Sequence, residues 1–428
     1  MTPGEPSPVR AQRPRRAPVP DDPALPRLPV LLDPEAIAPF LHRSLGPDAP
    51  FPDVRIDYLR YKPGTNIVVG YDVGLDGRGY DAVAMIKAGR SLARRAEKPE
   101  NVALARLVDG RSPAPMPLHY VPELDALIQW FPLDLDLPTL AEPPARLLDE
   151  LDAAGVSLGA VDGDPATLAY KPRRRAVLGV GRHVLKIYAH QERFAAAAAG
   201  LRAAAGLSGV RTATLQGQLT TKLVIVQAAL SGSRPSQPAD VALEAGRLLH
   251  DLHSSRAPDQ RTTERETGLA PAEPSHQLAA AALSTCLVTA LLPTLGSRVQ
   301  ALLRELEAEM PSIDDLVPTH GDFSARQLLV RPDGLAAIDF DAMCLAPAAL
   351  DPATYASFLV SGGGDELDEA MEVLEQLLEG YGDRPDGLPW YLATCILRRS
   401  PFPFRYLDEH WPERIEGMIA ASEAALRR

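Results

Sequence analysis

The chain has 428 residues, a length that suggests about two or three domains, and its 46% of hydrophobic residues are ample for buried cores. Its net charge of −12 argues against nucleic acid as a main partner, because phosphate binding needs a basic surface. The three cysteines, Cys286, Cys344 and Cys395, are too widely spaced for a disulfide framework or a zinc site, which favours a reducing, cytoplasmic location.

Residues 1–30 are rich in proline and arginine and contain no apolar segment of the kind found in signal peptides. We expect them to form a disordered tail. The longest apolar stretch, 278–295, contains Pro293 and is short for a membrane span. It predicts a buried helix, so we expect no membrane partner.

Two segments of the chain look like copies of one pattern. Residues 58–130 and 168–229 each read as a strand, a tight turn, two more strands, a helical stretch and two further strands. The third strand ends in Lys87 in the first copy and in Lys186 in the second, 99 residues later. The last strands are offset by 98 residues. Such a near-constant offset indicates a tandem duplication.

The second copy runs into a predicted helix at 240–254, with Asp240 as its N-cap. His250 and His253 share one face of this helix. No third ligand accompanies them, so a role in packing is favoured over metal binding. Three more helices are expected after residue 362, at 366–380, 390–399 and 411–428.

The most informative motif is His320-Gly321-Asp322, followed seventeen residues later by Asp339. Two apolar runs separated by Asp333-Gly334 predict a β-hairpin between them. The hairpin would bring the loop that carries Asp322 beside the end of the strand that carries Asp339. Two carboxylates in this arrangement suit phosphoryl transfer, because one can accept a proton from the attacking hydroxyl while the other holds Mg²⁺ at the nucleotide phosphates.

This block resembles the aminoglycoside phosphotransferase/choline kinase superfamily, which carries His-Gly-Asp-x-x-x-x-Asn and then Ile-Asp-Phe/Leu-Asp/Gly. Gln327 stands where the family usually has Asn, as in maltokinase-like members. The resemblance implies an α+β, protein-kinase-like bilobal fold, with an antiparallel-sheet N-lobe and a mainly helical C-lobe, preceded by a second N-lobe-like cap domain. The implied divisions are a tail (1–30), the cap (31–145), a nucleotide-binding N-lobe (146–232) and a C-lobe with the catalytic loop and acceptor site (233–428).

The resemblance also implies roles for the motif residues. Asp322 would be the base or orienter of the acceptor hydroxyl, and His320 would orient the catalytic loop. Gln327 and Asp339 would hold Mg²⁺. Lys186 would contact the nucleotide phosphates, because chain order places the second copy next to the catalytic loop; Lys87 is the alternative. Further expectations are that Asp341 could contact a second metal, that Asp351 has a structural role, and that Arg326 reaches phosphate or lies on the surface.

Other nucleotide contacts are expected from position. The turn at 171–175 stands where protein kinases have a glycine-rich loop, and Arg174 there could supply charge to the phosphates or simply be solvated. Gln227 and Ala229 lie where the hinge offers groups to adenine. Glu192 is the only acid near the start of the following helix. It either pairs with Lys186 or complements the helix dipole.

Together these features predict an enzyme: an ATP- or GTP-dependent O-phosphotransferase that uses Mg²⁺. It would act on a hydroxyl of a small molecule, such as an aminoglycoside, a sugar, an amino alcohol or a related metabolite. The sequence does not decide whether the protein forms a homodimer. One alternative is a pseudokinase or nucleotide-binding module without turnover, favoured by the missing helix glutamate but opposed by the presence of Asp322 and Asp339. Another is a kinase that acts on Ser or Thr of a biosynthetic peptide.

Overall fold

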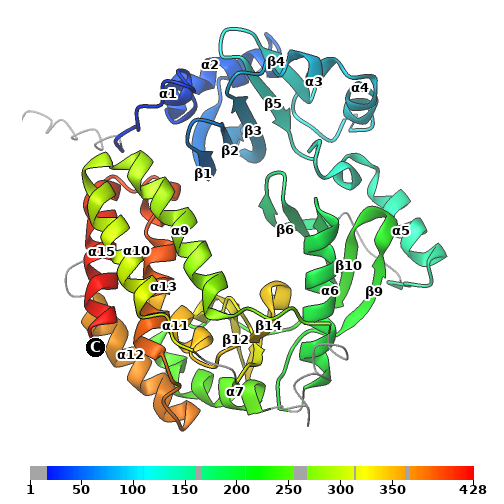
Figure 1. The fold of residues 1–428 in the computed structure, drawn as a ribbon. Coiled ribbons are helices and arrows are strands. Elements are labelled where there is room, and N and C mark those ends of the chain that lie inside the picture. Colours follow the sequence, from blue (N-terminus) through cyan, green and yellow to red (C-terminus); the bar gives the residue numbers. More distant parts are fainter. Residues whose placement is uncertain are drawn as a thin grey trace, which may run out of the picture.

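The computed structural model describes residues 17–108, 110–159, 165–207, 209–254, 268–312, 315–361 and 366–428. Within these ranges the chain forms two five-stranded antiparallel sheets, two small two-stranded sheets and a large helical part. In Figure 1 the first large sheet is blue to cyan, the second is green, and the helical part runs from green through yellow to red. Strands and helices are mostly segregated, which confirms the expected α+β class.

The first sheet has the strand order β1-β2-β3-β5-β4. Residues of β2 alternate between two cores, because successive side chains of a strand point to opposite faces. Val69 and Val73 share one core with helices α1 and α2, and Val68 shares the other with Ala105 of α4. The elements are α1 (Leu28–Leu31), α2 (Pro34–Leu45), β1 (Asp53–Lys62), β2 (Asn66–Leu75), β3 (Arg78–Lys87), α3 (Ala93–Glu97), α4 (Pro99–Arg106), β4 (Leu118–Val121) and β5 (Ala126–Trp130).

Residues 17–30 are not the disordered tail that composition suggested; residues 1–16 lie outside the described part of the chain. Leu25 and Leu28 are fully buried in the core of the first sheet. The Asp22 carboxylate accepts a hydrogen bond from the Tyr61 hydroxyl (2.8 Å). Proline and arginine dominate the composition of this segment, but its few spaced leucines are enough to pack it against the first sheet.

The second sheet repeats the topology of the first, with the order β6-β7-β8-β10-β9. Helix α5 leads into it, and the long helix α6 follows its third strand (Figure 1). Its elements are α5 (Pro144–Ala153), β6 (Ala166–Lys171), β7 (Arg175–Val180), β8 (His183–Tyr188), α6 (Gln191–Gly206), β9 (Leu215–Leu219) and β10 (Val224–Ala228). The strand order agrees with the pattern of two copies that the sequence indicated.

The strand register corrects the alignment of the two copies. Gln129 pairs with Val83 in the first sheet, and Gln227 pairs with Val184 in the second. When these pairs are superposed, the counterpart of Lys186 is Met85, two residues before Lys87. The two copies therefore cannot be aligned so that Gln129 matches Gln227 and Lys87 also matches Lys186. The strands of the β2–β3 hairpin are longer than those of β7–β8, which displaces the lysine that ends β3.

The helical part packs around two small sheets, β11–β14 and β12–β13 (Figure 1). Asp240 is not the N-cap of the expected helix, because it lies inside a short 3₁₀ turn where its carboxylate accepts from the Gln237 N–H (3.1 Å). The elements are η3 (Ala239–Val241), α7 (Ala242–Ser254), α9 (Pro274–Leu291), α10 (Gly296–Ala308), β11 (Val317–Thr319), η5 (Ala325–Gln327), β12 (Leu328–Arg331), β13 (Gly334–Ala337), η6 (Phe340–Ala342), β14 (Cys344–Ala346), α11 (Leu350–Ser357), α12 (Glu366–Tyr381), α13 (Leu388–Arg399), α14 (Phe402–Arg405) and α15 (Trp411–Leu426).

The first sheet also contacts the end of the chain. The rings of Tyr61 in β1 and Phe404 in α14 lie 5.8 Å apart, and the Trp411 indole N–H donates to the Pro18 carbonyl (2.9 Å). Side chains of β1–β3 and of α13 and α15 belong to one continuous core. Among the described residues, no helix combines the length and apolarity needed to span a bilayer.

Candidate active site

The predicted hairpin is present and places the two motif aspartates together. Strands β12 and β13 pair from Leu328 with Ala337 to Arg331 with Gly334. Beyond the last pair, the Ile338 N–H donates to the Gln327 carbonyl (2.9 Å). Asp339 therefore follows directly on the strand that pairs with the end of the Asp322 loop.

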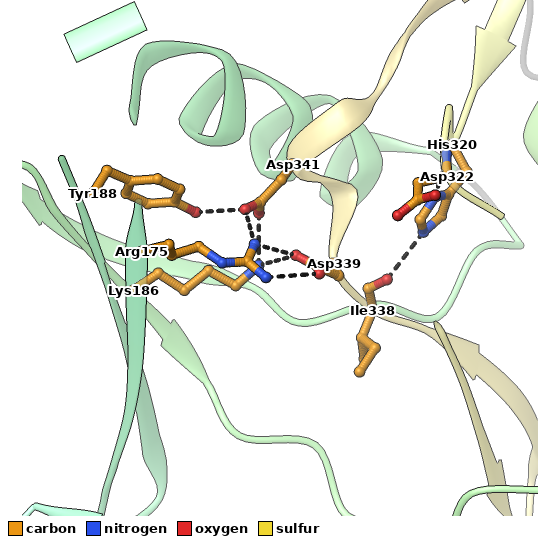
Figure 2. Close-up of polar contacts among 8 residues, drawn as sticks. All are labelled: Arg175, Lys186, Tyr188, His320, Asp322, Ile338, Asp339 and Asp341. Atoms are coloured by element: carbon orange, nitrogen blue, oxygen red, sulfur yellow. Dashed lines mark hydrogen bonds and ion pairs between the residues drawn. The ribbon is translucent and has the colours of Figure 1, made fainter. Parts of the chain in front are cut away.

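The loop at 320–322 is fixed by a buried carboxylate. Asp351, at the start of α11, is fully buried and accepts from the backbone N–H groups of His320 (2.7 Å) and Gly321 (2.9 Å). His320 is also fully buried, and its Nε2 donates to the Ile338 carbonyl (2.9 Å), as Figure 2 shows. His320 thus ties the Asp322 loop to the residue before Asp339.

Asp351 is held in turn by His253 of α7. The His253 Nε2 donates to the Asp351 carboxylate (3.2 Å), and its Nδ1 shares a hydrogen bond with the Tyr381 hydroxyl (3.0 Å). His250 contacts the Tyr381 carbonyl instead (3.0 Å). The two histidines are therefore engaged in packing and loop support. Across the described ranges, no cluster of three or more His, Cys, Asp or Glu side chains could hold a metal.

Two backbone positions explain why the motif has these residues. Gly321 has a φ of 78°, and a Cβ there would overlap the Ala342 carbonyl oxygen. Only glycine therefore fits between the loop and η6. Asp339 has a φ of 66°, which is uncommon for a residue with a side chain. This left-handed conformation turns the chain sharply from β13 into η6.

Asp339 and Asp341 are bridged by two cations from the second sheet (Figure 2). The Lys186 Nζ lies 2.7 Å from Asp339 and 2.6 Å from Asp341. The Arg175 guanidinium forks onto both oxygens of Asp339 (2.9 and 3.2 Å) and also contacts Asp341. The Tyr188 hydroxyl donates to Asp341 (2.9 Å). The third strand of the second sheet is thereby connected directly to the Asp339 motif.

The two motif carboxylates have opposite electrostatic environments. Burial raises the pKa of Asp322 above its ordinary value, and the negative charge of Asp339 adds to this, against the lowering effect of His320 and Arg398. Burial also opposes ionisation of Asp339, but Lys186 and Arg175 outweigh it and hold its pKa well below the ordinary value. Neighbouring carboxylates with pKa values pushed apart are suited to different chemical roles.

Helix α6 passes close to the Asp339 turn because it is made of small residues. A Cβ on Gly200 would overlap the Phe340 carbonyl oxygen, so glycine permits this approach. Glu192 is exposed in the first turn of α6, whereas the carboxylates bonded to Lys186 are Asp339 and Asp341. Asp341 therefore takes the position of lysine partner that the sequence offered to Glu192.

A cavity of about 290 Å³ opens beside these groups. It combines the two motif aspartates with basic side chains from three regions of the chain. Its lining comprises Arg60, Lys171, Arg174, Arg175, Tyr188, His190, Arg193, Asp322, Asp339, Asp341 and Ala342. Of the residues expected at the nucleotide site, Arg174 reaches this cavity; Lys186 lies behind it, bonded to Asp339.

The expected hinge residues are not among those that line the cavity. Gln227 is a buried residue of β10, and Ala229 follows that strand. The Ala229 N–H donates to the Arg182 carbonyl (2.9 Å), so this donor is already used. Gln327 is half-buried at the end of η5, with its backbone against Ile338. Arg326 beside it is exposed.

The β6–β7 turn, which occupies the place of a glycine-rich loop, is anchored to the first sheet's unit. Asp134 follows β5 and is only 1% exposed. It accepts from the Arg173 backbone N–H (2.6 Å) and the Tyr170 hydroxyl (2.9 Å). Arg173 itself has a φ of 61° and pairs with Asp136. Side-chain and backbone contacts from another part of the chain thus fix a turn that lacks glycine.

The donor chemistry of the motif fits Mg²⁺. Asp339 offers carboxylate oxygens, and Gln327 offers an amide oxygen from the strand that pairs with it, at the same open end of the β12–β13 hairpin. Mg²⁺ prefers oxygen ligands and is typically held by one or two carboxylates together with substrate phosphates, so a larger protein cage is not needed.

Sequence reasoning missed three residues of the site. Arg175 was treated as one of several turn arginines, although its place opposite Tyr188 at the start of β7 directs it at Asp339. Tyr188 carried no motif signal, but it lies two residues after Lys186 on the same face of β8. Arg60 comes from the first sheet, and no local pattern connects it with the cavity.

Comparison with known proteins identifies the class of this protein. Residues 171–391 match the model of the phosphotransferase enzyme family, and the chain belongs to this family. It is a phosphotransferase of the kinase type that acts on hydroxyl groups, with the kinase-like fold expected from its motifs. No curated protein matches the chain.

Solved structures give weaker similarities. A choline/ethanolamine kinase family protein from Mesorhizobium loti is 16% identical, with a TM-score of 0.43, over 65% of this chain and 98% of that one. The macrolide 2'-phosphotransferase MphH from Brachybacterium faecium is 20% identical, with a TM-score of 0.42, over 66% and 97%. A choline kinase from Cryptosporidium parvum is 10% identical, with a TM-score of 0.46, over 67% and 96%.

Proposed function

We propose that this protein transfers the γ-phosphate of ATP to a hydroxyl group of a small molecule. The observation that carries the proposal is the pair of carboxylates at one cavity, Asp322 with a raised pKa and Asp339 with a depressed one. The raised pKa suits Asp322 to accept the proton of the acceptor hydroxyl. The depressed pKa keeps Asp339 anionic and suits it to a metal ligand.

In the proposed mechanism, His320 and Asp351 hold the catalytic loop so that Asp322 faces the acceptor hydroxyl. Asp322 orients this hydroxyl and takes its proton as the oxygen bonds to the γ-phosphorus, while the bond from that phosphorus to the β–γ bridging oxygen breaks and ADP leaves. Asp339 and Gln327 would hold Mg²⁺, which when bound neutralises charge on the phosphates. Lys186 contributes positive charge from β8, and Arg174 contributes it from the β6–β7 turn.

In this proposal, residues 146–232 bind the nucleotide, and residues 233–428 contain the catalytic loop and the acceptor site. Residues 31–145 form the cap that resembles a second N-lobe. Met85 stands in that cap where the second sheet has Lys186, so an apolar side chain replaces the phosphate contact. This supports a cap that does not bind nucleotide. The three cysteines are free, which supports a cytoplasmic location.

The decisive experiment measures ATP turnover against a panel of hydroxyl acceptors with the wild-type chain and Asp322→Asn. Turnover should fall by ~10²–10⁴ in the variant while the affinity for ATP stays nearly unchanged, because a positioned base contributes about that factor. Wild-type turnover in the variant would remove Asp322 from its role. ATP binding without turnover on any acceptor, in wild type as well, would instead favour the pseudokinase alternative.

A further inference from the structure

The cavity contains far more positive charge than its carboxylates can neutralise. Five cationic side chains line it, against the three carboxylates of Asp322, Asp339 and Asp341. Asp339 and Asp341 are already paired with Lys186 and Arg175. This excess is local, because the whole chain has a net charge of −12. A concave site with uncompensated positive charge attracts and holds anions.

Arg60 and Arg174 line the cavity, and the charges of both act on a third arginine, Arg405. Arg60 comes from β1, Arg174 from the β6–β7 turn and Arg405 from α14. Partial burial of the Arg405 guanidinium lowers its pKa, and the nearby charges of Arg174 and Arg60 lower it further, although Tyr58 opposes them. In the described ranges none of the three pairs with a carboxylate, whereas Arg173 and Arg175 beside them do.

Arg399, the last residue of α13, is a second and independent sign of an anion site. It is only 9% exposed, and its Nε has no hydrogen-bond partner. Its guanidinium carbon lies 3.4 Å from the ring centre of Phe358 and 4.5 Å from that of Phe402. No described carboxylate forms an ion pair with it. A buried guanidinium that packs against two rings presents its N–H donors in a fixed geometry, and here the Nε donor has no acceptor.

The charge of Arg399 acts on the catalytic loop, on the side where we propose that the acceptor binds. Its charge and that of Arg398 act directly on the Asp322 carboxylate, which must face the acceptor hydroxyl. Burial lowers the pKa of Arg399 to about 10, so it still carries its charge at neutral pH. The cations assigned to the nucleotide, Lys186 and Arg174, belong to the second sheet instead.

We propose that the acceptor carries an anionic group, a phosphate or a carboxylate, in addition to its hydroxyl, and that Arg399, Arg405 and Arg60 bind this group. The inference rests on the proposed kinase function and narrows its substrate class. It excludes cationic acceptors such as aminoglycosides and choline, because like charges would face each other across a partly desolvated site. It also gives the cap a role, since Arg60 completes the acceptor site from the first sheet.

The test uses the full-length chain and does not require the natural acceptor. Calorimetry first measures the affinity for Mg·AMP-PNP. Inorganic phosphate and succinate are then titrated separately into protein saturated with Mg·AMP-PNP. Arg60→Gln and Arg405→Gln remove one charge each from residues that are not deeply buried, and Arg399→Gln removes the buried charge. Arg55→Gln is the matched control, because Arg55 lies on the same strand as Arg60 and pairs with Asp72 (2.6 Å).

We expect the nucleotide-loaded protein to bind at least one of the two anions. The three variants should weaken that binding about tenfold or more, because each removes a charged donor. Their Mg·AMP-PNP affinity should stay within about twofold, as in Arg55→Gln. Phosphate binding alone would identify a phosphorylated acceptor, and succinate binding would identify a carboxylate. A panel of matched sugars should then show ³²P transfer to the anionic member in preference to the neutral and amino forms.

Two results would overturn the inference. One is a nucleotide-loaded protein that binds neither anion. The other is a set of variants that lose Mg·AMP-PNP affinity as strongly as anion affinity, which would assign these arginines to the nucleotide. If Arg399→Gln fails to fold, Arg60→Gln and Arg405→Gln still decide the question. Failure of the wild-type chain to bind Mg·AMP-PNP is a separate outcome that refutes the proposed function.

Discussion

The anchor between Asp134 and the β6–β7 turn leads to a quantitative prediction for Asp134→Asn. The carboxylate accepts hydrogen bonds from the Arg173 N–H and Tyr170 hydroxyl on one oxygen and from the Asp136 N–H (2.9 Å) on the other. An amide keeps the size but has one oxygen, so at least one donor must face an NH₂ group. Loss of a hydrogen bond to a charged group costs about 1.5–3 kcal/mol.

This loss should appear in nucleotide binding, because the released turn carries Arg174 into the cavity. Since about 1.4 kcal/mol corresponds to a factor of ten, we expect the Kd of Mg·ATP to rise roughly ten- to a hundredfold. Calorimetry with the full-length chain measures it. The matched control is Asp125→Asn, a substitution in the cap at a residue that accepts from Tyr120 (2.7 Å) and Ser91 (3.0 Å). Equal nucleotide affinity in the two variants would refute the idea that the cap positions the turn for ATP.

Three further predictions concern the motif residues. Asp339→Ala should abolish the Mg²⁺ dependence of ATP binding, and calorimetry that showed unchanged Mg·ATP affinity would move the metal site elsewhere. Lys186→Ala should strongly raise the ATP KM or lower kcat, whereas Lys87→Ala should do little; steady-state kinetics with the opposite ranking would make the first sheet the nucleotide site. Because the pKa of Asp322 is raised and the base must be ionised, kcat should fall with decreasing pH at a midpoint above the ordinary Asp value. An unchanged profile in Asp322→Asn would assign that titration to another group.

The sequence predicted the parts of the site that depend on local spacing. The hairpin between Asp322 and Asp339 is encoded by two apolar runs and a turn, and the structure contains it. The structural role of Asp351 was expected from the family resemblance. Such features depend on a few consecutive residues, so they can be read without knowledge of the rest of the fold.

Contacts between distant segments could not be predicted in the same way. Arg175 and Asp339 are separated by 164 residues, and nothing in either local sequence indicates that they pair. Arg60 reaches the cavity from the first sheet, which shares a core with the C-terminal helices, and no local pattern in the sequence indicates this. The matching of Lys87 with Lys186 failed because identity of residue type was compared without strand register.

The first sheet's unit contacts both other parts of the molecule, through Asp134 and the β6–β7 turn on one side and through Tyr61 and Phe404 on the other. The three parts therefore form a closed frame rather than two bodies on a single hinge (Figure 1). Domain closure in two-body enzymes is a rotation about a few residues. Contacts between all three parts oppose such a rotation, so we expect the parts to move little relative to one another when reactants exchange.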